Sequence, residues 1–162
     1  MSALPYCAIC LFLTVPYRQP DKFSPRAFEA TRETSADPDR IWQIWTDVAG
    51  WKNWDSGLQE ARLAGAFVAG AKGKIVALNG RTASFRVTEV EAGVSYTYRV
   101  KLPLAALEIT RRLDQTGGRT IFTHQVRFVG LLGGVFARVL GRRFRELLPE
   151  VMENVKALAE NS

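Results

Sequence analysis

Hydrophobic and polar residues alternate along much of the chain, which is the two-residue period of β-strands with one buried face. The first such run covers residues 28–34, and a dense series begins after Gly57 with glycine and polar turns between the runs. No helical pattern separates the runs of this series, so they predict an antiparallel meander instead of parallel βαβ units. The six runs read LQEARLAG, GKIVAL, TASFRVTEV, VSYTYRVKL, LEITRRL and RTIFTHQVRF.

A short helix is predicted directly after the first strand. Asp37 is a natural N-cap and Pro38 suits the first helical position, while Gly50 should stop the helix. Apolar residues recur at three- and four-residue spacing between these signals, which is typical of an amphipathic helix with one buried face. The expected inward positions are Ile41, Ile44, Trp45 and Val48.

A long amphipathic helix is predicted from Leu131 to Ala159, where the spacing of apolar residues changes to three and four. At the rise of an α-helix this segment is long enough to cross the sheet. Gly141 and Pro149 lie inside it and predict a kink. The expected inward positions are Phe136, Leu140, Phe144, Leu147, Val151, Val155 and Leu158.

The last two strands form the most informative hairpin. If residues 115–118 make the turn, Arg111 faces Phe122 and Ile109 faces His124 across the ladder. This register puts apolar residues on one face of both strands, and that face must be buried. The predicted inward residues are Leu107, Ile109, Arg111, Leu113, Phe122, His124, Val126 and Phe128, joined by Phe85, Val87, Tyr96, Tyr98 and Val100.

The first 26 residues do not share these patterns, so we expect an N-terminal extension (1–26) before a single domain (27–162). Its apolar run from Leu4 to Val15 has no Lys or Arg before it, which favours a cytoplasmic protein over a secreted one. Cys7 and Cys10 form a CxxC outside any thioredoxin-like βαβ pattern, so the spacing is interpreted as chance.

Composition narrows the function classes. The chain has 162 residues, the usual size of one domain, and lacks an apolar run long enough to span a bilayer, which excludes a membrane channel or transporter. Two Cys and one His cannot make a four-ligand zinc site, and Asp47 with Asp55 supplies too few oxygens for a hard cation. No Walker, Rossmann or GxSxG motif occurs. We therefore expect no metal and no cofactor.

Two polar residues on the predicted inner face are the candidates for chemistry. His124 can act as an acid or base near neutral pH, or it can be a core histidine bonded to a neighbour. Arg111 can bind a carboxylate or enolate oxygen, or its guanidinium can reach solvent from a strand end. Together they would suit proton transfer next to a carbonyl.

Several other groups keep two interpretations. The hydroxyls of Tyr96 and Tyr98 can meet a ligand oxygen or pack in the core. Trp51 and Trp54 can lie at the mouth of the sheet or plug the core. A net charge of +6 and a basic stretch in the last helix allow an anionic lipid or RNA surface, but acidic residues follow in the same helix and favour a solvated face. We therefore expect no nucleic-acid partner. The basic residues are Arg138, Arg142, Arg143 and Arg145.

The order of elements and the strings IWQIWTDVAGWKNWDSGL, GKI, FRVTEV, FTHQVRFVG and LPEVMENVKALAE resemble the START-like superfamily, and within it the SRPBCC group of polyketide cyclase/dehydrase and lipid-transport proteins. The resemblance covers residues 27–160. It implies an α+β helix-grip fold, in which a curved antiparallel sheet with two short helices after its first strand wraps around a long kinked C-terminal helix.

The resemblance also implies an internal cavity that binds a small hydrophobic or aromatic molecule, lipid-like or polyketide-like. The alternative is a cofactor-independent cyclase or dehydratase that uses acid/base chemistry in the same cavity. Both expectations depend on a hollow interior, and neither specifies the oligomeric state. The expected ligand-binding residues are Trp51, Trp54, Phe85, Tyr96, Tyr98, Ile109, Arg111, Phe122, His124 and Phe144, with His124 and Arg111 as the catalytic candidates.

Overall fold

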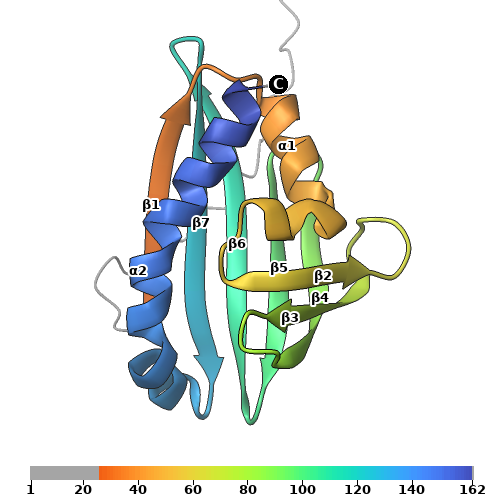
Figure 1. Ribbon diagram of the computed structural model, residues 1–162, viewed down its shortest axis with the longest axis vertical. Helices are drawn as coiled ribbons and strands as arrows, with labels where there is room; N and C mark the ends of the chain where they lie inside the picture. Colours follow the sequence, from red (N-terminus) through yellow and green to blue (C-terminus); the bar gives the residue numbers. More distant parts are fainter. Residues whose placement is uncertain (1–25, 162) are drawn as a thin grey trace, which may run out of the picture.

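The computed structural model describes residues 26–161, so the predictions for the extension and for Cys7 and Cys10 lie outside the described residues. Over the described part, seven antiparallel strands form one curved sheet in the order β1-β7-β6-β5-β4-β3-β2 (Figure 1). This is the predicted meander, with the first strand added beside the last. The strands are β1 (Ala27–Thr34), β2 (Leu58–Leu63), β3 (Lys72–Ala77), β4 (Thr82–Glu91), β5 (Ser95–Leu102), β6 (Ala105–Thr116) and β7 (Arg119–Gly130).

Two short helices follow β1, as expected: α1 (Pro38–Thr46) and the 3₁₀ helix η1 (Val48–Asn53). The Asp37 carboxylate accepts a hydrogen bond from the backbone N–H of Asp39 and so caps α1. The prediction that Gly50 stops the helix is wrong. The α-helix ends at Thr46, and the Asp47 side chain accepts from the Gly50 N–H and starts η1, which continues through Gly50.

The hairpin register differs from the prediction by two residues. The turn is the pair Gly117-Gly118, with φ of 58° and 77°, and Thr116 pairs with Arg119. Two glycines with positive φ form the tight turn that suits the twist of a hairpin, so the ladder extends further than a four-residue turn allows. Arg111 therefore faces His124 instead of Phe122. Because the shift is even, the predicted inward face is unchanged, and all eight of its residues are buried.

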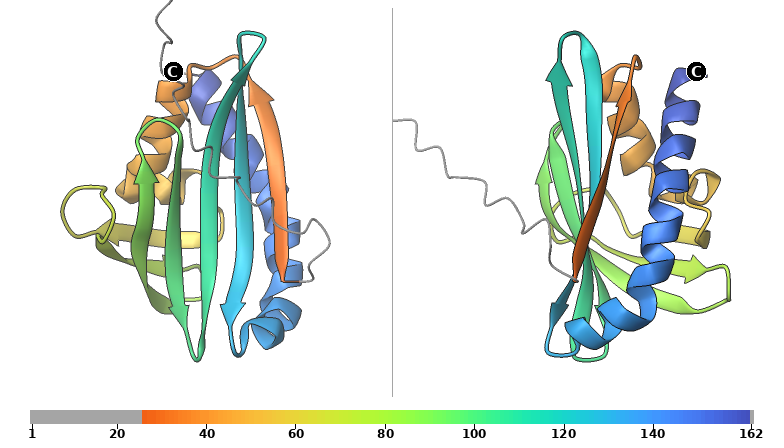
Figure 2. Two further views of the ribbon diagram at one scale, coloured as in Figure 1. Left: turned by 180° about the vertical axis from the view of Figure 1, so that it is seen from behind. Right: turned by 90° about the vertical axis from the view of Figure 1, so that its left-hand side faces the viewer.

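The long helix α2 runs from Gly133 to Glu160 with Pro149 inside it. It packs along β1 and β7, and its first turns lie at an angle to the rest (Figure 2). The predicted inward stripe is partly wrong, because small residues make the closest approach and large residues flank them. Fully buried positions are Gly133, Ala137, Gly141, Leu148, Val151, Met152, Val155 and Ala159, whereas Phe136, Leu140, Phe144 and Leu147 are partly buried and Leu158 is exposed.

All three helices lie on the same face of the sheet, which confirms the helix-grip fold (Figures 1 and 2). α2 covers one half of this face, and η1 packs against β2 on the other. No helix within residues 26–161 is long and apolar enough to cross a membrane. The hydrophobic core lies between the helices and the inner face of the sheet.

Candidate functional site

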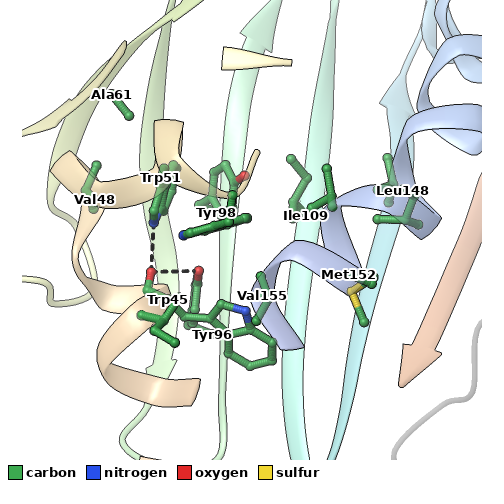
Figure 3. Packing of buried hydrophobic residues seen from close by; sticks show 14 of the residues in the cluster. Trp45, Val48, Trp51, Ala61, Tyr96, Tyr98, Ile109, Leu148, Met152 and Val155 are labelled. Atoms are coloured by element: carbon green, nitrogen blue, oxygen red, sulfur yellow. Dashed lines mark hydrogen bonds between the residues drawn. The ribbon is translucent and has the colours of Figure 1, made fainter. Parts of the chain in front are cut away.

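The C-terminal end of α1 holds two aromatic side chains in place. The last carbonyl groups of a helix have no partner inside the helix, and the carbonyl of Trp45 lies in this position. It accepts hydrogen bonds from Trp51 Nε1, at 2.8 Å, and from the Tyr96 hydroxyl, at 3.1 Å (Figure 3). One carbonyl thereby fixes η1 and β5 relative to each other.

Arg111 lies at the centre of the inner face with no exposed surface. Its guanidinium carbon lies 4.9 Å from the ring centre of Trp51 and 4.6 Å from that of Trp54. The same group donates to the Tyr96 hydroxyl and, at 3.4 Å, to the Tyr98 hydroxyl. A planar cation can stack on aromatic faces and bond at its edge, which is the geometry seen here.

The charges around Arg111 depend on one another. Burial raises the pKa of the Tyr96 hydroxyl to about 12, although the Arg111 charge acts in the opposite direction. Burial also raises the pKa of the Asp55 carboxyl above its ordinary 3.8, while Arg111 and the Gly57 N–H oppose this shift. Arg111 itself keeps its charge, because Tyr96, Tyr98 and Asp55 outweigh the effect of burial and raise its pKa.

His124 lies opposite Arg111 in the β6–β7 ladder and is 5% exposed. Burial, followed by the positive charge of Arg111, brings the pKa of His124 well below its ordinary 6.5. The imidazole is therefore neutral near pH 7, a form with one nitrogen that donates and one that accepts. The neutral ring has a free nitrogen that can accept a proton, but the protonated form is unfavourable because of burial and the Arg111 charge.

Three nitrogen atoms in or against this cluster are buried without a hydrogen-bond partner among the described residues: Arg111 Nε, Trp54 Nε1 and Trp45 Nε1. Buried donors are nearly always satisfied, and an unpaired one costs free energy. Such donors next to an aromatic cluster offer hydrogen bonds to an acceptor oxygen supplied from outside the chain.

The structure brings six of the ten predicted ligand-binding residues into one aromatic cluster around Arg111. Ile109 faces Tyr98 across β5 and β6, and Phe122 packs against Trp45 with ring centres 6.2 Å apart. Phe144 is only partly buried and pairs with Phe128 instead. The cluster consists of Trp51, Trp54, Phe85, Tyr96, Tyr98 and Arg111.

Sequence reasoning considered Asp55 only as a metal ligand and missed its place beside Arg111. Asp55 lies in a loop, where no periodicity indicates which way a side chain points. The available signal was the run Trp51 to Asp55, with two tryptophans and a carboxylate before the first strand of the meander. Within residues 26–161, no three His, Cys, Asp or Glu side chains lie together in a way that would hold a metal ion.

Solved structures of low sequence identity share this fold. A protein from Helicobacter pylori is 11% identical, with a TM-score of 0.71, over 98% of this chain and 99% of that chain. A protein from Nitrosomonas europaea is 14% identical, with a TM-score of 0.69, over 85% and 96%. The di-domain ARO/CYC StfQ from the steffimycin biosynthetic pathway is 12% identical, with a TM-score of 0.67, over 83% and 50%. Identities this low show the fold alone.

No curated protein matches the chain. The family described as polyketide cyclase/dehydrase and lipid transport matches residues 25–160, which is most of the chain. The chain therefore belongs to the polyketide cyclase/dehydrase and lipid transport family, within the SRPBCC group of the START-like superfamily.

Proposed function

We propose that the protein binds a small hydrophobic or aromatic molecule between the inner face of the sheet and the helices, with Arg111 as its polar anchor. The family description, which names polyketides and lipids, supports this role. The aromatic cluster supports it too, because ligand sites are mostly apolar with a few polar groups that orient the ligand. The ligand class is an apolar or aromatic molecule with a carbonyl, phenolate or carboxylate oxygen.

The observation that carries the proposal is the unpaired Nε of Arg111. This residue has no exposed surface, and within residues 26–161 its other nitrogens donate to two phenol hydroxyls while Nε has no partner. A buried charge is costly unless it is paired and hydrogen-bonded. A ligand oxygen at Nε would satisfy the guanidinium, while the ligand's rings would replace aromatic contacts within the cluster.

Burial of the apolar part of the ligand would supply most of the affinity. Removal of a few hundred Å² from water, at about 25 cal/mol per Å², gives several kcal/mol before the entropic cost of binding. A micromolar dissociation constant is within this range.

An anilinonaphthalene sulfonate provides a test, because it joins an aromatic body to an anion and fluoresces when it is buried. Arg111→Met should weaken its binding by about tenfold, the size of one charge-assisted hydrogen bond. Arg112→Met is the matched control, since this neighbour points to the outer face and pairs with Asp114. Equal affinity of both variants and the unmodified protein would reject Arg111 as the anchor.

A second variant covers the case in which Arg111→Met fails to fold. Tyr98→Phe keeps the ring stack and removes one hydroxyl that Arg111 reaches. The freed Arg111 donor should keep or strengthen binding of the sulfonate, so this variant should bind the sulfonate more tightly than a neutral naphthalene probe. A purely apolar site would bind the two probes equally. Stronger binding of the neutral probe would contradict the polar anchor.

The second candidate function is a cofactor-independent cyclase or dehydratase. The observation that favours it is the pair of Asp55 and His124. The Asp55 carboxyl has a raised pKa and is close enough to the Arg111 cation to feel its charge, and the neutral imidazole of His124 lies across the β6–β7 ladder from Arg111. An acid and a base with shifted pKa values are typical of catalytic sites. His124→Ala should then abolish turnover of a linear poly-β-ketone while probe affinity stays within about tenfold, which would separate catalysis from binding.

A further inference from the structure

Large apolar side chains are exposed together at one end of the molecule, away from the Arg111 cluster. The β5–β6 turn and the start of α2 meet there, joined by a hydrogen bond from the Leu132 N–H to the Leu104 carbonyl at 3.2 Å (Figures 1 and 2). Contiguous exposed apolar side chains on a soluble fold usually mark an interaction site. The exposed fractions are 70% for Leu104, 80% for Leu131, 53% for Val135 and 70% for Val139.

Leu104 also has an unfavourable backbone conformation. Its φ is 50°, and it is the one residue other than glycine with a positive φ within residues 26–161. A bulky side chain in the left-handed region is strained, and glycine would relieve the strain. Stability alone therefore explains neither the residue type nor its exposure, and strain of this kind often accompanies function.

The first part of α2 carries positive charge and no acidic residue of its own. Residues 130–145 contain four arginines and no Asp or Glu. Arg142 pairs with Glu146, and Arg145 lies over the ring of Phe28. Arg138 and Arg143 are exposed, and neither makes an ion pair within the described part of the chain.

We propose that this end docks on an anionic lipid surface. Val135 and Val139 lie four residues apart, so their side chains extend from one side of the start of α2, with Arg138 and Arg143 beside them, and the exposed Leu131 lies in the turn just before the helix. Apolar side chains that enter the acyl boundary, next to cations at headgroup level, are the pattern of interfacial helices. Each arginine near such a surface adds attraction to anionic headgroups. The surface is separate from Arg111, so the inference stands independently of the proposed ligand site.

Vesicle sedimentation with the full chain tests the proposal. The protein should bind vesicles of phosphatidylcholine with about 30% phosphatidylglycerol and bind pure phosphatidylcholine much more weakly, and added salt should reduce the binding. Leu131→Ser/Val135→Ser/Val139→Ser should lower the partition coefficient by about tenfold or more. Arg138→Gln/Arg143→Gln should lower it about fivefold for each arginine. Equal binding of these variants would overturn the proposal.

Matched controls place the same changes elsewhere. Leu78→Ser/Val94→Ser alters exposed apolar residues in two other hairpin turns. Lys72→Gln/Lys74→Gln alters two cations that line a hollow of about 790 Å³ on the outer face of the sheet. Both controls should bind the anionic vesicles as the unmodified protein does. Loss of binding in the lysine variant would assign lipid binding to the outer face and reject the proposed end.

Two other occupants of the apolar surface give different results. If a second copy of the chain covers it, light scattering will show a dimer that the triple serine variant converts to a monomer. If the N-terminal apolar run covers it, Leu11→Ser/Phe12→Ser/Leu13→Ser will expose the surface and increase vesicle binding. A dimer, or lipid binding that appears only in this N-terminal variant, would overturn docking by the protein in its natural form.

Discussion

Arg111 is a charged side chain in a position where the alternation of a strand requires an apolar one. It lies on the inner face of β6, and its charge is accommodated by two tryptophan faces, two phenol hydroxyls and the nearby Asp55 carboxyl. Each of these partners depends on the flat, forked shape of the guanidinium. The site therefore requires arginine, and a cation of another shape does not replace it.

Arg111→Lys should cost about 3 kcal/mol of unfolding free energy, because an ammonium cannot stack on both tryptophans and leaves a buried charge poorly paired. Arg111→Met should cost less, about 1.5 kcal/mol, since an apolar side chain of similar length needs no partner and Asp55 can take up a proton. Urea unfolding with the slope held constant measures both values. A lysine variant as stable as the unmodified protein would contradict the stacking argument.

His124 gives the protein a pH dependence with a definite sign. The folded state keeps the imidazole neutral because its pKa lies well below 6.5, whereas the unfolded chain takes up a proton below that pH. Stability should therefore fall as the pH drops below 6.5, by up to about 1.4 kcal/mol per pH unit until the folded pKa is reached. His124→Gln should lack this part of the loss. Urea unfolding at several pH values between 7 and 5 measures the loss of unfolding free energy in both proteins. An equal loss in both would contradict the buried neutral imidazole.

At the scale of elements, the sequence predicted most of what periodicity controls. The inward face of β6 and β7 was correct because any even error in register keeps it. The partner of Arg111 was wrong because the ends of the turn depend on Gly117 and Gly118, which a four-residue turn also includes. Asp55 was missed because a loop has no period. The stripe of α2 was misjudged because apolar size was counted, although Gly141 and its small neighbours allow the closest packing.

Two glycines in different elements should respond in opposite ways to alanine. A Cβ at Gly141 in α2 would lie 3.9 Å from Phe128, an ordinary contact, so Gly141→Ala should stabilise the protein by about 1 kcal/mol through helix propensity. A Cβ at Gly73 in β3 would overlap the Phe85 ring and the Arg62 carbonyl, so Gly73→Ala should destabilise it by about 2 kcal/mol or more. Thermal melts of the two variants provide the comparison, and shifts of the same sign would contradict this packing.

At the scale of the molecule, the inner face is closed by side chains from distant parts of the sequence. η1 and the residue that follows it contribute Trp51 and Trp54, and the strands β4 to β7 contribute the rest of the cluster and His124. These groups are at most a few per cent exposed. A ligand that binds among them must therefore wait for η1 to move away from the sheet, and the hydrogen bonds of Trp51 and Tyr96 to the shared Trp45 carbonyl oppose that motion.

Uptake of a fluorescent probe should accordingly be limited by opening. The observed rate constant in stopped-flow mixing should level off as the probe concentration rises, because binding then follows a conformational step. Trp51→Phe removes the hydrogen bond to Trp45 and should raise the plateau about fivefold, the effect of a bond of about 1 kcal/mol. Trp42→Phe is the control, since Trp42 touches Tyr96 only through ring contact at 5.9 Å. A rate constant that rises linearly to the highest probe concentration would mean that the site is open to solvent, and an equal plateau in both variants would mean that η1 does not control entry.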